Sequence, residues 1–429
     1  MPENWKTYKF SELFETASGL SKSRDQFGFG SPFLTFKDVF YNYFIPSELG
    51  DLANTTEKEQ IRGSVKRGDI FLTRTSETLH ELGMSSVALK DYPNATFNGF
   101  CKRLRQKNGS TVKIHPEFIG YFLRSNSFRN EVSSHATMTT RASLNNTSIS
   151  SLSITLPPFA EQVEIGQILK ALDAKIELNL QMNKTLEEMA MALYKHWFVD
   201  FGPFQDGEFV DSELGEIPKG WEVKRLDEIS FVKGGKRLPK GAQLQTNPNS
   251  HPYLRVKDFN STYLNVSGME YVPDDVFSSI SNYIVNTGDI TLSIVGTIGK
   301  VALIGEDLNL ASLTENCVKI TSKTETIFSE IIYLQLTSKN GQDEIQSKTV
   351  GSTQPKLPIY NINSLNLAFP TDFTVVKKVT IELQNWFKII YSNTIENQTL
   401  TQLRDTLLPK LISGEVSVKV AEKTLSEVL

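Results

Sequence analysis

Basic, hydroxyl and amide side chains gather in a few short, turn-rich stretches, and these residues have the clearest chemical potential in the sequence. In the first 157 residues the densest groups are KRLRQK at 102–107 and HATMTTRAS at 135–143. Comparable groups appear later, in VKGGKRLPK at 232–240 and SKTVGSTQPK at 347–356. Lys, Arg and small hydroxyls contact phosphates, and Arg, Lys, Asn and Gln donate to base edges. The chemistry that these stretches favour is therefore nucleic-acid binding.

Twenty residues are candidates for such contacts. In the first part of the chain they are Lys66, Arg67, Arg74, Lys102, Arg103, Arg105, Lys107, Thr139, Thr140 and Arg141. In the later part they are Lys233, Lys236, Arg237, Arg255, Lys300, Lys348, Ser352, Thr353, Gln354 and Lys356. For any single residue the alternative is a solvated surface charge. The loops around Arg141 and Gln354 are the strongest candidates, because they occupy matched positions in a repeat described below.

Catalytic motifs are poorly supported. The run Leu156-Pro157-Pro158-Phe159 resembles the Asn/Asp-Pro-Pro-aromatic loop of amino-methyltransferases, but Leu stands where a polar residue must accept from the target amine. VGTIGK at 295–300 lacks the first glycine and the hydroxyl residue of a phosphate-binding loop. Pro273-Asp274-Asp275 has no following carboxylate-x-Lys partner, and the five histidines show no metal-ligand spacing. We expect no catalytic residues and no metal site, and binding is the better account.

Charge is unevenly distributed along the chain. The net charge of -4 argues weakly against a nucleic-acid partner. However, residues 158–217 carry 4 Lys+Arg against 12 Asp+Glu, whereas residues 1–157 carry 19 against 15. Residues 218–370 carry 15 of each, and residues 371–429 carry 7 of each. The acidity lies in one segment, so the overall charge does not exclude DNA.

Bulk composition is that of an ordinary globular protein, with 39% hydrophobic and 22% charged residues. The sequence has neither a secretory leader nor an apolar run of membrane-spanning length, so we expect a cytoplasmic protein without membrane contact. The two cysteines, Cys101 and Cys317, are too few and too far apart for a disulfide framework or a zinc cluster. We interpret both as buried core thiols.

The chain repeats itself almost from end to end. Trp5 corresponds to Trp221, PFLTFKD at 32–38 to PYLRVKD at 252–258, and Gly68-Asp69-Ile70 to Gly288-Asp289-Ile290. Cys101 corresponds to Cys317, and TRASL at 140–144 to TQPKL at 353–357. The offset drifts by only a few residues, as loop insertions in a duplicated domain would produce.

Each half combines a mixed domain with a helical segment. Residues 1–157 and 218–370 alternate short β-branched runs with turns and helical stretches, which predicts two α/β (α+β) domains. Residues 158–200 and 371–413 are helical in pattern, 201–217 form a Gly-, Pro- and acid-rich linker, and 414–429 form a C-terminal tail.

Both helical segments carry a heptad stripe interrupted by two asparagines. The stripe runs from Ile165 to Trp197 in the first segment and from Val379 to Leu411 in the second. Asn179 and Asn183 lie at the middle of one stripe, and Asn393 and Asn397 lie at the middle of the other. Antiparallel packing would pair Asn179 with Asn397 and Asn183 with Asn393 in one polar layer that fixes the register. The alternative is that these amides are solvated and each helix packs on its own domain.

Three stretches resemble the conserved regions of the specificity subunit of type I restriction-modification systems. They are LPPFAEQVEIGQILKALDAKIELNLQMNKTLEEMAMALYKHWFVDF at 156–201, SELGEIPKGWEV at 212–223 and TLLPKLISGEV at 406–416. The resemblance implies two target recognition domains in a pseudo-two-fold arrangement, separated by a long antiparallel two-helix coiled coil. Its implied partners are double-stranded DNA, two methyltransferase subunits that bind S-adenosylmethionine and, in the full complex, motor-endonuclease subunits.

Outward-facing helix residues would dock those partners. The candidates are Glu187, Glu188, Tyr194 and Phe198, although Phe198 and Trp197 could instead pack on the adjacent domain. Two other functions stay open at this stage. One is a duplicated protein-binding scaffold without DNA, and the other, which the motifs favour less, is an adenine-specific DNA methyltransferase.

Overall fold

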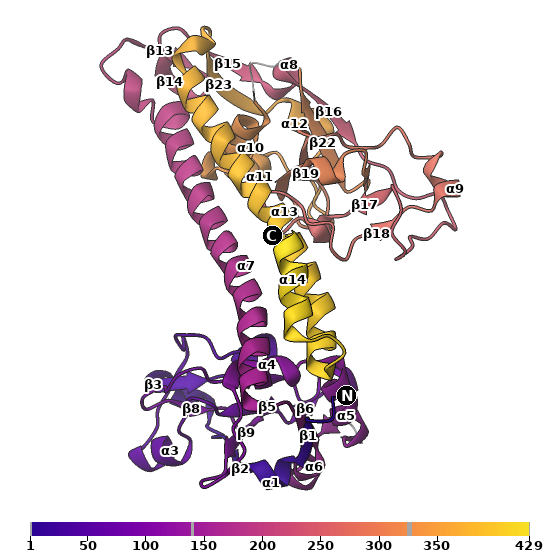
Figure 1. Ribbon diagram of the computed structural model, residues 1–429. Helices are drawn as coiled ribbons and strands as arrows, with labels where there is room; N and C mark the ends of the chain where they lie inside the picture. The colour runs from indigo at the N-terminus through magenta and orange to yellow at the C-terminus, as the bar shows by residue number, and fades with distance from the viewer. Residues whose placement is uncertain (1, 139–140, 324–327, 429) are drawn as a thin grey trace. The chain divides into compact units, whose positions relative to one another are not determined.

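The protein folds into two compact units. The computed structural model describes residues 2–138, 141–323 and 328–428 (Figure 1). Unit 1 comprises residues 1–175 and 400–429, and unit 2 comprises residues 176–399. The boundary crosses both long helices, α7 (Phe159–Tyr194) and α13 (Lys377–Ser413), so each unit contains a part of both.

Unit 1 is built on an antiparallel four-stranded sheet. Its strand order is β2 (Phe14–Ser18), β9 (Cys101–Gln106), β5 (Ile70–Thr73) and β7 (Ser85–Val87). One smaller sheet has the order β4 (Leu52–Ala53), β3 (Phe27–Leu34) and β8 (Thr96–Phe97). A second pairs β1 (Lys6–Lys9) with β12 (Ser153–Leu156). A third has the order β10 (Thr137–Met138), β11 (Ala142–Ser143) and β6 (Thr75–Ser76). Strand β5 is buried over its whole length because it lies inside the sheet and is apolar except at Thr73. The helices of this domain are α1 (Phe10–Leu13), α2 (Phe36–Tyr41), α3 (Glu57–Arg62), α4 (Pro116–Phe122), α5 (Asn126–Ser134) and α6 (Asn146–Ser151).

Unit 2 repeats three of these four sheets. The four-stranded sheet has the order β16 (Ser230–Gly234), β22 (Cys317–Ser322), β19 (Ile290–Ser293) and β20 (Val301–Leu303). The companions are β18 (Glu270–Tyr271), β17 (Pro252–Leu254) and β21 (Ser312–Leu313), together with β15 (Trp221–Arg225) paired to β23 (Asn366–Pro370). Each unit has one parallel pair of strands in a small sheet, which is β3 with β8 in unit 1 and β17 with β21 in unit 2. The helices are α8 (Leu226–Ile229), α9 (Asp274–Phe277), α10 (Ser329–Thr337), α11 (Lys339–Ser347) and α12 (Ile359–Asn363). The predicted duplication is confirmed.

The predicted linker has structure of its own. Strands β13 (Phe209–Ser212) and β14 (Gly215–Pro218) form an antiparallel hairpin in unit 2. Phe201 and Ile217 are buried, and Phe201 packs edge-on against Trp221 with ring centroids 5.1 Å apart. The segment is therefore attached to the second domain by apolar contacts.

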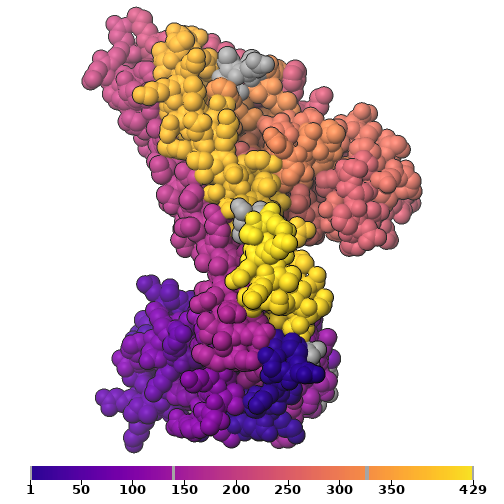
Figure 2. Space-filling model, viewed as in Figure 1, coloured from indigo at the N-terminus to yellow at the C-terminus, as the bar shows by residue number. Residues whose placement is uncertain are grey.

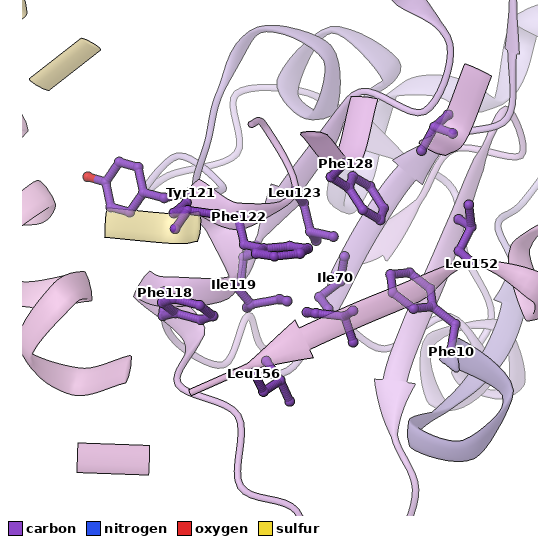
Figure 3. Packing of buried hydrophobic residues seen from close by; sticks show 14 of the residues in the cluster. Phe10, Ile70, Phe118, Ile119, Tyr121, Phe122, Leu123, Phe128, Leu152 and Leu156 are labelled. Atoms are coloured by element: carbon purple, nitrogen blue, oxygen red, sulfur yellow. The ribbon is translucent and has the colours of Figure 1, made fainter. Parts of the chain in front are cut away.

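The core of unit 1 joins the domain to the helices. Phe10 stacks on Phe128 with ring centroids 5.7 Å apart, and Ile70, Phe118 and Leu152 belong to the same cluster (Figure 3). The hydroxyl of Tyr121 points away from the other labelled side chains (Figure 3) and donates to Asp173 of α7 at 2.6 Å. Asp173 also pairs with Arg404 of α13 at 2.8 Å. One carboxylate thus holds α4, α7 and α13 together.

Unit 2 attaches its domain to α7 through α10. The Tyr194 hydroxyl of α7 donates to Gln335 of α10 at 2.6 Å. Tyr194 and Phe198 are buried in the unit 2 core, and their rings stack with centroids 5.2 Å apart. Helix α7 continues here as a π-helical turn, Lys195–Val199. A straight α-helix has 3.6 residues per turn, so its buried face drifts away from a stripe that repeats every 3.5 residues. The π turn rotates the following side chains further around the helix axis. The buried side chains are therefore Tyr194 and Phe198 and not the predicted Leu193 and Trp197.

The two long helices run antiparallel and meet through the asparagines. Asn179 Nδ2 donates to Asn397 Oδ1 at 2.9 Å, and Asn393 Nδ2 donates to Asn183 Oδ1 at 2.8 Å. All four side chains are at most 9% exposed and all four belong to unit 2. Further hydrogen bonds surround the layer, since Asn179 also donates to the Glu396 carboxylate at 2.7 Å, and Asn183 and Asn397 donate to the carbonyls of Ile390 and Ile176, both at 3.3 Å. The predicted polar layer and its antiparallel pairing are confirmed, and the solvated alternative is wrong.

The last residues of the chain form a helix that was not predicted. Helix α14 (Val418–Val428) buries Val418 and Ala421 in the unit 1 core. Gly414 precedes it with φ +71°, and a Cβ there would lie 2.5 Å from Pro2 Cδ and 3.3 Å from Trp5. The N-terminal residues therefore pack against the turn that precedes α14, and Figure 2 shows indigo residues beside yellow ones.

Both cysteines lie in the cores. Cys101 and Cys317 are fully buried, and burial raises the pKa of each thiol to about 12. Among the described residues no helix is long and apolar enough to cross a membrane.

The amide layer predicts a non-additive pair of substitutions. Asn183→Leu leaves the buried Asn393 amide without its acceptor, so we expect the free energy of unfolding to fall by roughly 1–3 kcal/mol. Adding Asn393→Leu removes the orphaned group, and the double variant should recover most of that loss. Urea unfolding of the full chain measures both effects, and additive losses in the double variant would contradict the pairing.

Candidate nucleic-acid interface

A buried aspartate before the central strand recurs in both units. In unit 1 the Asp69 carboxylate accepts from the Lys66 backbone N–H at 2.8 Å, and in unit 2 Asp289 accepts from the Asn286 N–H at the same distance. Both aspartates are almost fully buried at the start of the central strands β5 and β19. The repeated Gly-Asp-Ile motif is therefore a structural turn, and the sequence did not reveal which cations the buried carboxylates attract.

Three of the predicted contact residues in unit 1 have partners within the domain, and one of them pairs with the buried aspartate. Arg105 makes two hydrogen bonds of 2.6 Å to Asp69, which raise the pKa of the guanidinium. Arg103 donates to the Ser64 carbonyl at 2.5 Å, and Lys102 donates to Ser18 Oγ at 2.7 Å. Burial lowers the pKa of both Arg103 and Lys102. All three side chains have partners inside the domain, and Arg105 neutralises its buried carboxylate, so the prediction that they contact DNA stays a prediction.

Other candidates in unit 1 lie at the surface. Lys66 is exposed, Lys107 is exposed and donates to the Ser11 carbonyl, and Arg67 donates to the Leu89 carbonyl. Arg74 is half-buried, and its carbonyl accepts from the Leu144 N–H at 2.9 Å. Of the proposed hairpin residues Arg141 is exposed and lies 3.7 Å from Glu77, whereas Thr139 and Thr140 are outside the described residues.

The candidates in unit 2 divide in the same way. Arg255 pairs with Glu270, Lys300 donates to the Phe259 carbonyl at 3.0 Å, and Lys348 donates to Ser364. These three are half-buried and act within the domain. The surface set comprises Lys233, Lys236, Arg237, Ser352, Thr353, Gln354 and Lys356, all of them exposed. Within that set Arg237 pairs with Glu315 at 2.5 Å, which raises the pKa of the guanidinium.

The loops around Arg141 and Gln354 occupy the same structural position. In unit 1 strand β11 pairs with both β10 and β6, through Ser143 opposite Thr137 and Thr75. In unit 2 Lys356, the residue that corresponds to Ser143, bridges to both Val350 and Val295. The Leu144 N–H donates to the Arg74 carbonyl, and the Leu357 N–H donates to the Ile294 carbonyl, both at 2.9 Å. Arg141 and Gln354 are thus presented at the tips of equivalent hairpins, as the sequence repeat predicted.

The expected docking residues on α7 are mostly turned inward. Tyr194 and Phe198 are buried in the unit 2 core, so the prediction that they face outward is wrong. Glu187 accepts a hydrogen bond from Thr262, which itself lies 3.0 Å from the Tyr333 hydroxyl. Glu188 is exposed, as predicted. The heptad periodicity did not predict that Tyr194 and Phe198 are buried, because the second domain covers this end of the helix.

Replacing Arg105 should lower the stability of the folded chain. Arg105→Ala leaves the buried Asp69 carboxylate unpaired, and we expect a loss of about 2 kcal/mol in the free energy of unfolding. The exposed Lys66→Ala is the matched control and should change it by less than about 0.5 kcal/mol. Urea unfolding compares the two variants, and equal stabilities would contradict the assigned role of Arg105.

Comparison with known proteins agrees with this geometry. The family model described as the type I restriction modification DNA specificity domain matches residues 2–188 and 218–403. The chain is 26% identical to the type I restriction enzyme MjaIX specificity subunit of Methanocaldococcus jannaschii, over 98% of this chain and 95% of that one. It is 23% identical to the type I restriction enzyme HindI specificity subunit of Haemophilus influenzae, over 96% of this chain and all of the relative.

A solved structure supports the fold independently. The crystal structure of a type I restriction-modification system S subunit from M. genitalium matches with a TM-score of 0.60 at 14% identity, covering 95% of this chain and 96% of the other. Two matched domains and two long helices agree with the fold class predicted from the sequence. The chain belongs to the family of type I restriction-modification DNA specificity subunits, which recognise DNA and do not catalyse the reactions of their complexes.

Proposed function

We propose that each of the two domains reads one half of a bipartite duplex sequence, and that the hairpin tips at Arg141 and Gln354 enter the two half-sites. The observation that carries this proposal is the equivalence of the two hairpins. The same backbone framework presents Arg in one unit and Gln in the other. Arg pairs best with guanine and Gln with adenine in the major groove, so one scaffold can display two different specificities.

We further propose that the outer surface of the helices docks methyltransferase subunits. Within unit 2, Leu178, Leu180, Met182 and Met189 of α7 are 43–53% exposed, and Ile381 and Ile389 of α13 are 44% and 42% exposed. Large apolar side chains repeated along a helix surface are typical of partner contacts. Glu188 lies on the same helix and would contribute a polar contact at the margin.

The chemistry then belongs to the partners. The methyltransferase subunits would bind S-adenosylmethionine, and motor-endonuclease subunits would complete the restriction complex. The DNA target places such a complex in the cytoplasm. A protein-binding scaffold would lack the loss of DNA affinity with salt that phosphate contacts produce, so a salt titration of duplex binding by the assembled complex separates the two functions.

The two hairpins should act on different halves of the target. We expect Arg141→Ala to weaken discrimination in one half-site by about 1–3 kcal/mol per affected base pair, and Gln354→Ala to do so only in the other. Binding of the assembled complex to duplexes mutated in either half measures this. Both variants affecting the same half-site would contradict the division of labour.

Tight binding should require the partners. Few of the candidate cations remain exposed on each domain, so we expect the isolated chain to bind the recognised duplex at least tenfold more weakly than the complex with its methyltransferase subunits. The two dissociation constants are compared at the same salt concentration. Equal values would show that the chain alone supplies the DNA-binding surface.

A further inference from the structure

A hollow beside Arg141 is the most distinctive surface feature of unit 1. It has a volume of about 500 Å³ and lies between α2, strand β6 with the loop that follows it, and the turn before β9. Its lining includes an aromatic wall with Tyr41 and Phe100, and it also includes Glu77, Glu81 and Arg141. The hollow is therefore continuous with the hairpin that the proposed function assigns to DNA.

Its aromatic wall is unusually exposed. The Tyr41 side chain is 73% exposed and Phe100 is 56% exposed, although neither is needed in the core. The corresponding positions of the second domain hold Ser261 and Asn316, by the matches of PFLTFKD with PYLRVKD and of Cys101 with Cys317. The apolar wall is thus a property of the first domain and not of the shared framework.

The acidic side of the hollow is also specific to the first domain. In unit 1 the Thr73 N–H donates to the Met84 carbonyl and the Gly83 N–H donates to the Thr73 carbonyl. In unit 2 Ser293, Lys300 and Gly299 make the same two hydrogen bonds. These hydrogen bonds close a loop in each domain. The loop has nine residues, 74–82, in the first domain and five, 294–298, in the second. The longer loop supplies both Glu77 and Glu81.

The Glu81 carboxylate is held in place with one oxygen available. Its Oε2 accepts from Thr78 Oγ1 at 2.9 Å and from Ser76 Oγ at 3.3 Å. Within the described part of the chain Oε1 has no hydrogen-bond partner. A carboxylate on a DNA-binding face is repelled by phosphates, and its favourable partner there is the exocyclic amino group of a base.

We propose that Glu81 reads a cytosine in the first half-site by accepting a hydrogen bond from its N4 amino group in the major groove, while Tyr41 and Phe100 contact the C5 edge of the same ring. The inference rests on the proposed function, because it places this hollow against the DNA. Cytosine fits better than adenine because adenine presents the N7 acceptor beside its amino group, and N7 would face the carboxylate. The aromatic wall matches the apolar C5–H edge next to N4.

The experiment pairs a protein change with a base change. The assembled complex, with wild-type or Glu81→Gln chain, is titrated with duplexes that carry the recognised sequence or a T·A pair in place of each C·G pair of the first half-site. Thymine presents the O4 acceptor where cytosine presents the N4 donor. We expect one such replacement to weaken wild-type binding about tenfold or more and to weaken binding of the variant little further. Glu48→Gln, an exposed carboxylate change in the same unit, should keep the full wild-type effect.

Each outcome decides a different claim. Equal sensitivity of the wild type and Glu81→Gln to every replacement, or a first half-site without cytosine, overturns the role of Glu81. A wild-type complex without sequence preference in either half overturns the proposed function itself. Because the comparison is a cycle of protein and base changes, a general loss of affinity or stability in Glu81→Gln cancels from the result.

Discussion

The amide layer between the two long helices is the interaction on which the architecture of this chain depends. A purely apolar heptad stripe can slip by one turn and still bury hydrocarbon, whereas two asparagine pairs form their hydrogen bonds in a single register. The hydrogen bonds of 2.9 Å and 2.8 Å join residues more than 200 positions apart, so they also fix which parts of the duplicated sequence come together. Within unit 2, the residues of α7 and α13 beside that layer take their partners from this register.

The domains attach to these helices by contacts that differ in chemistry. Unit 1 uses the carboxylate of Asp173 between Tyr121 and Arg404, and unit 2 uses the Tyr194 hydroxyl on Gln335. The sheets are alike in strand order and in the buried aspartates that begin their central strands. The surface loops then differ in length and in side chains, at 74–82 against 294–298 and at Arg141 against Gln354. A constant frame with variable loops is the arrangement expected of a protein that reads two different half-sites.

Much of this could be predicted from the sequence because it follows from period and repetition. The heptad stripes, the pairing of Asn183 with Asn393 and the equivalence of the Arg141 and Gln354 hairpins all depend on spacing, which a single sequence displays directly. The buried role of Arg105 could not be predicted, since a basic residue on a strand has the same signature whether it faces solvent or a buried aspartate. Tyr194 and Phe198 were misplaced for a similar reason, because the helix changes its buried face where the second domain covers it. Exposed aromatics such as Tyr41 carry no sequence signal that separates them from core residues.

Disulfide trapping across the helix pair tests the central claim most directly. In the register set by the asparagines, Leu186 lies opposite Ile390, whereas Leu383 is two turns away, about 10 Å along the axis. A full chain with Leu186→Cys and Ile390→Cys should form the cross-link under mild oxidation, and a chain with Leu186→Cys and Leu383→Cys should not. Cross-linking of the second pair, or failure of the first in a folded protein, would contradict the antiparallel register and with it the account of how the two halves of the chain are joined.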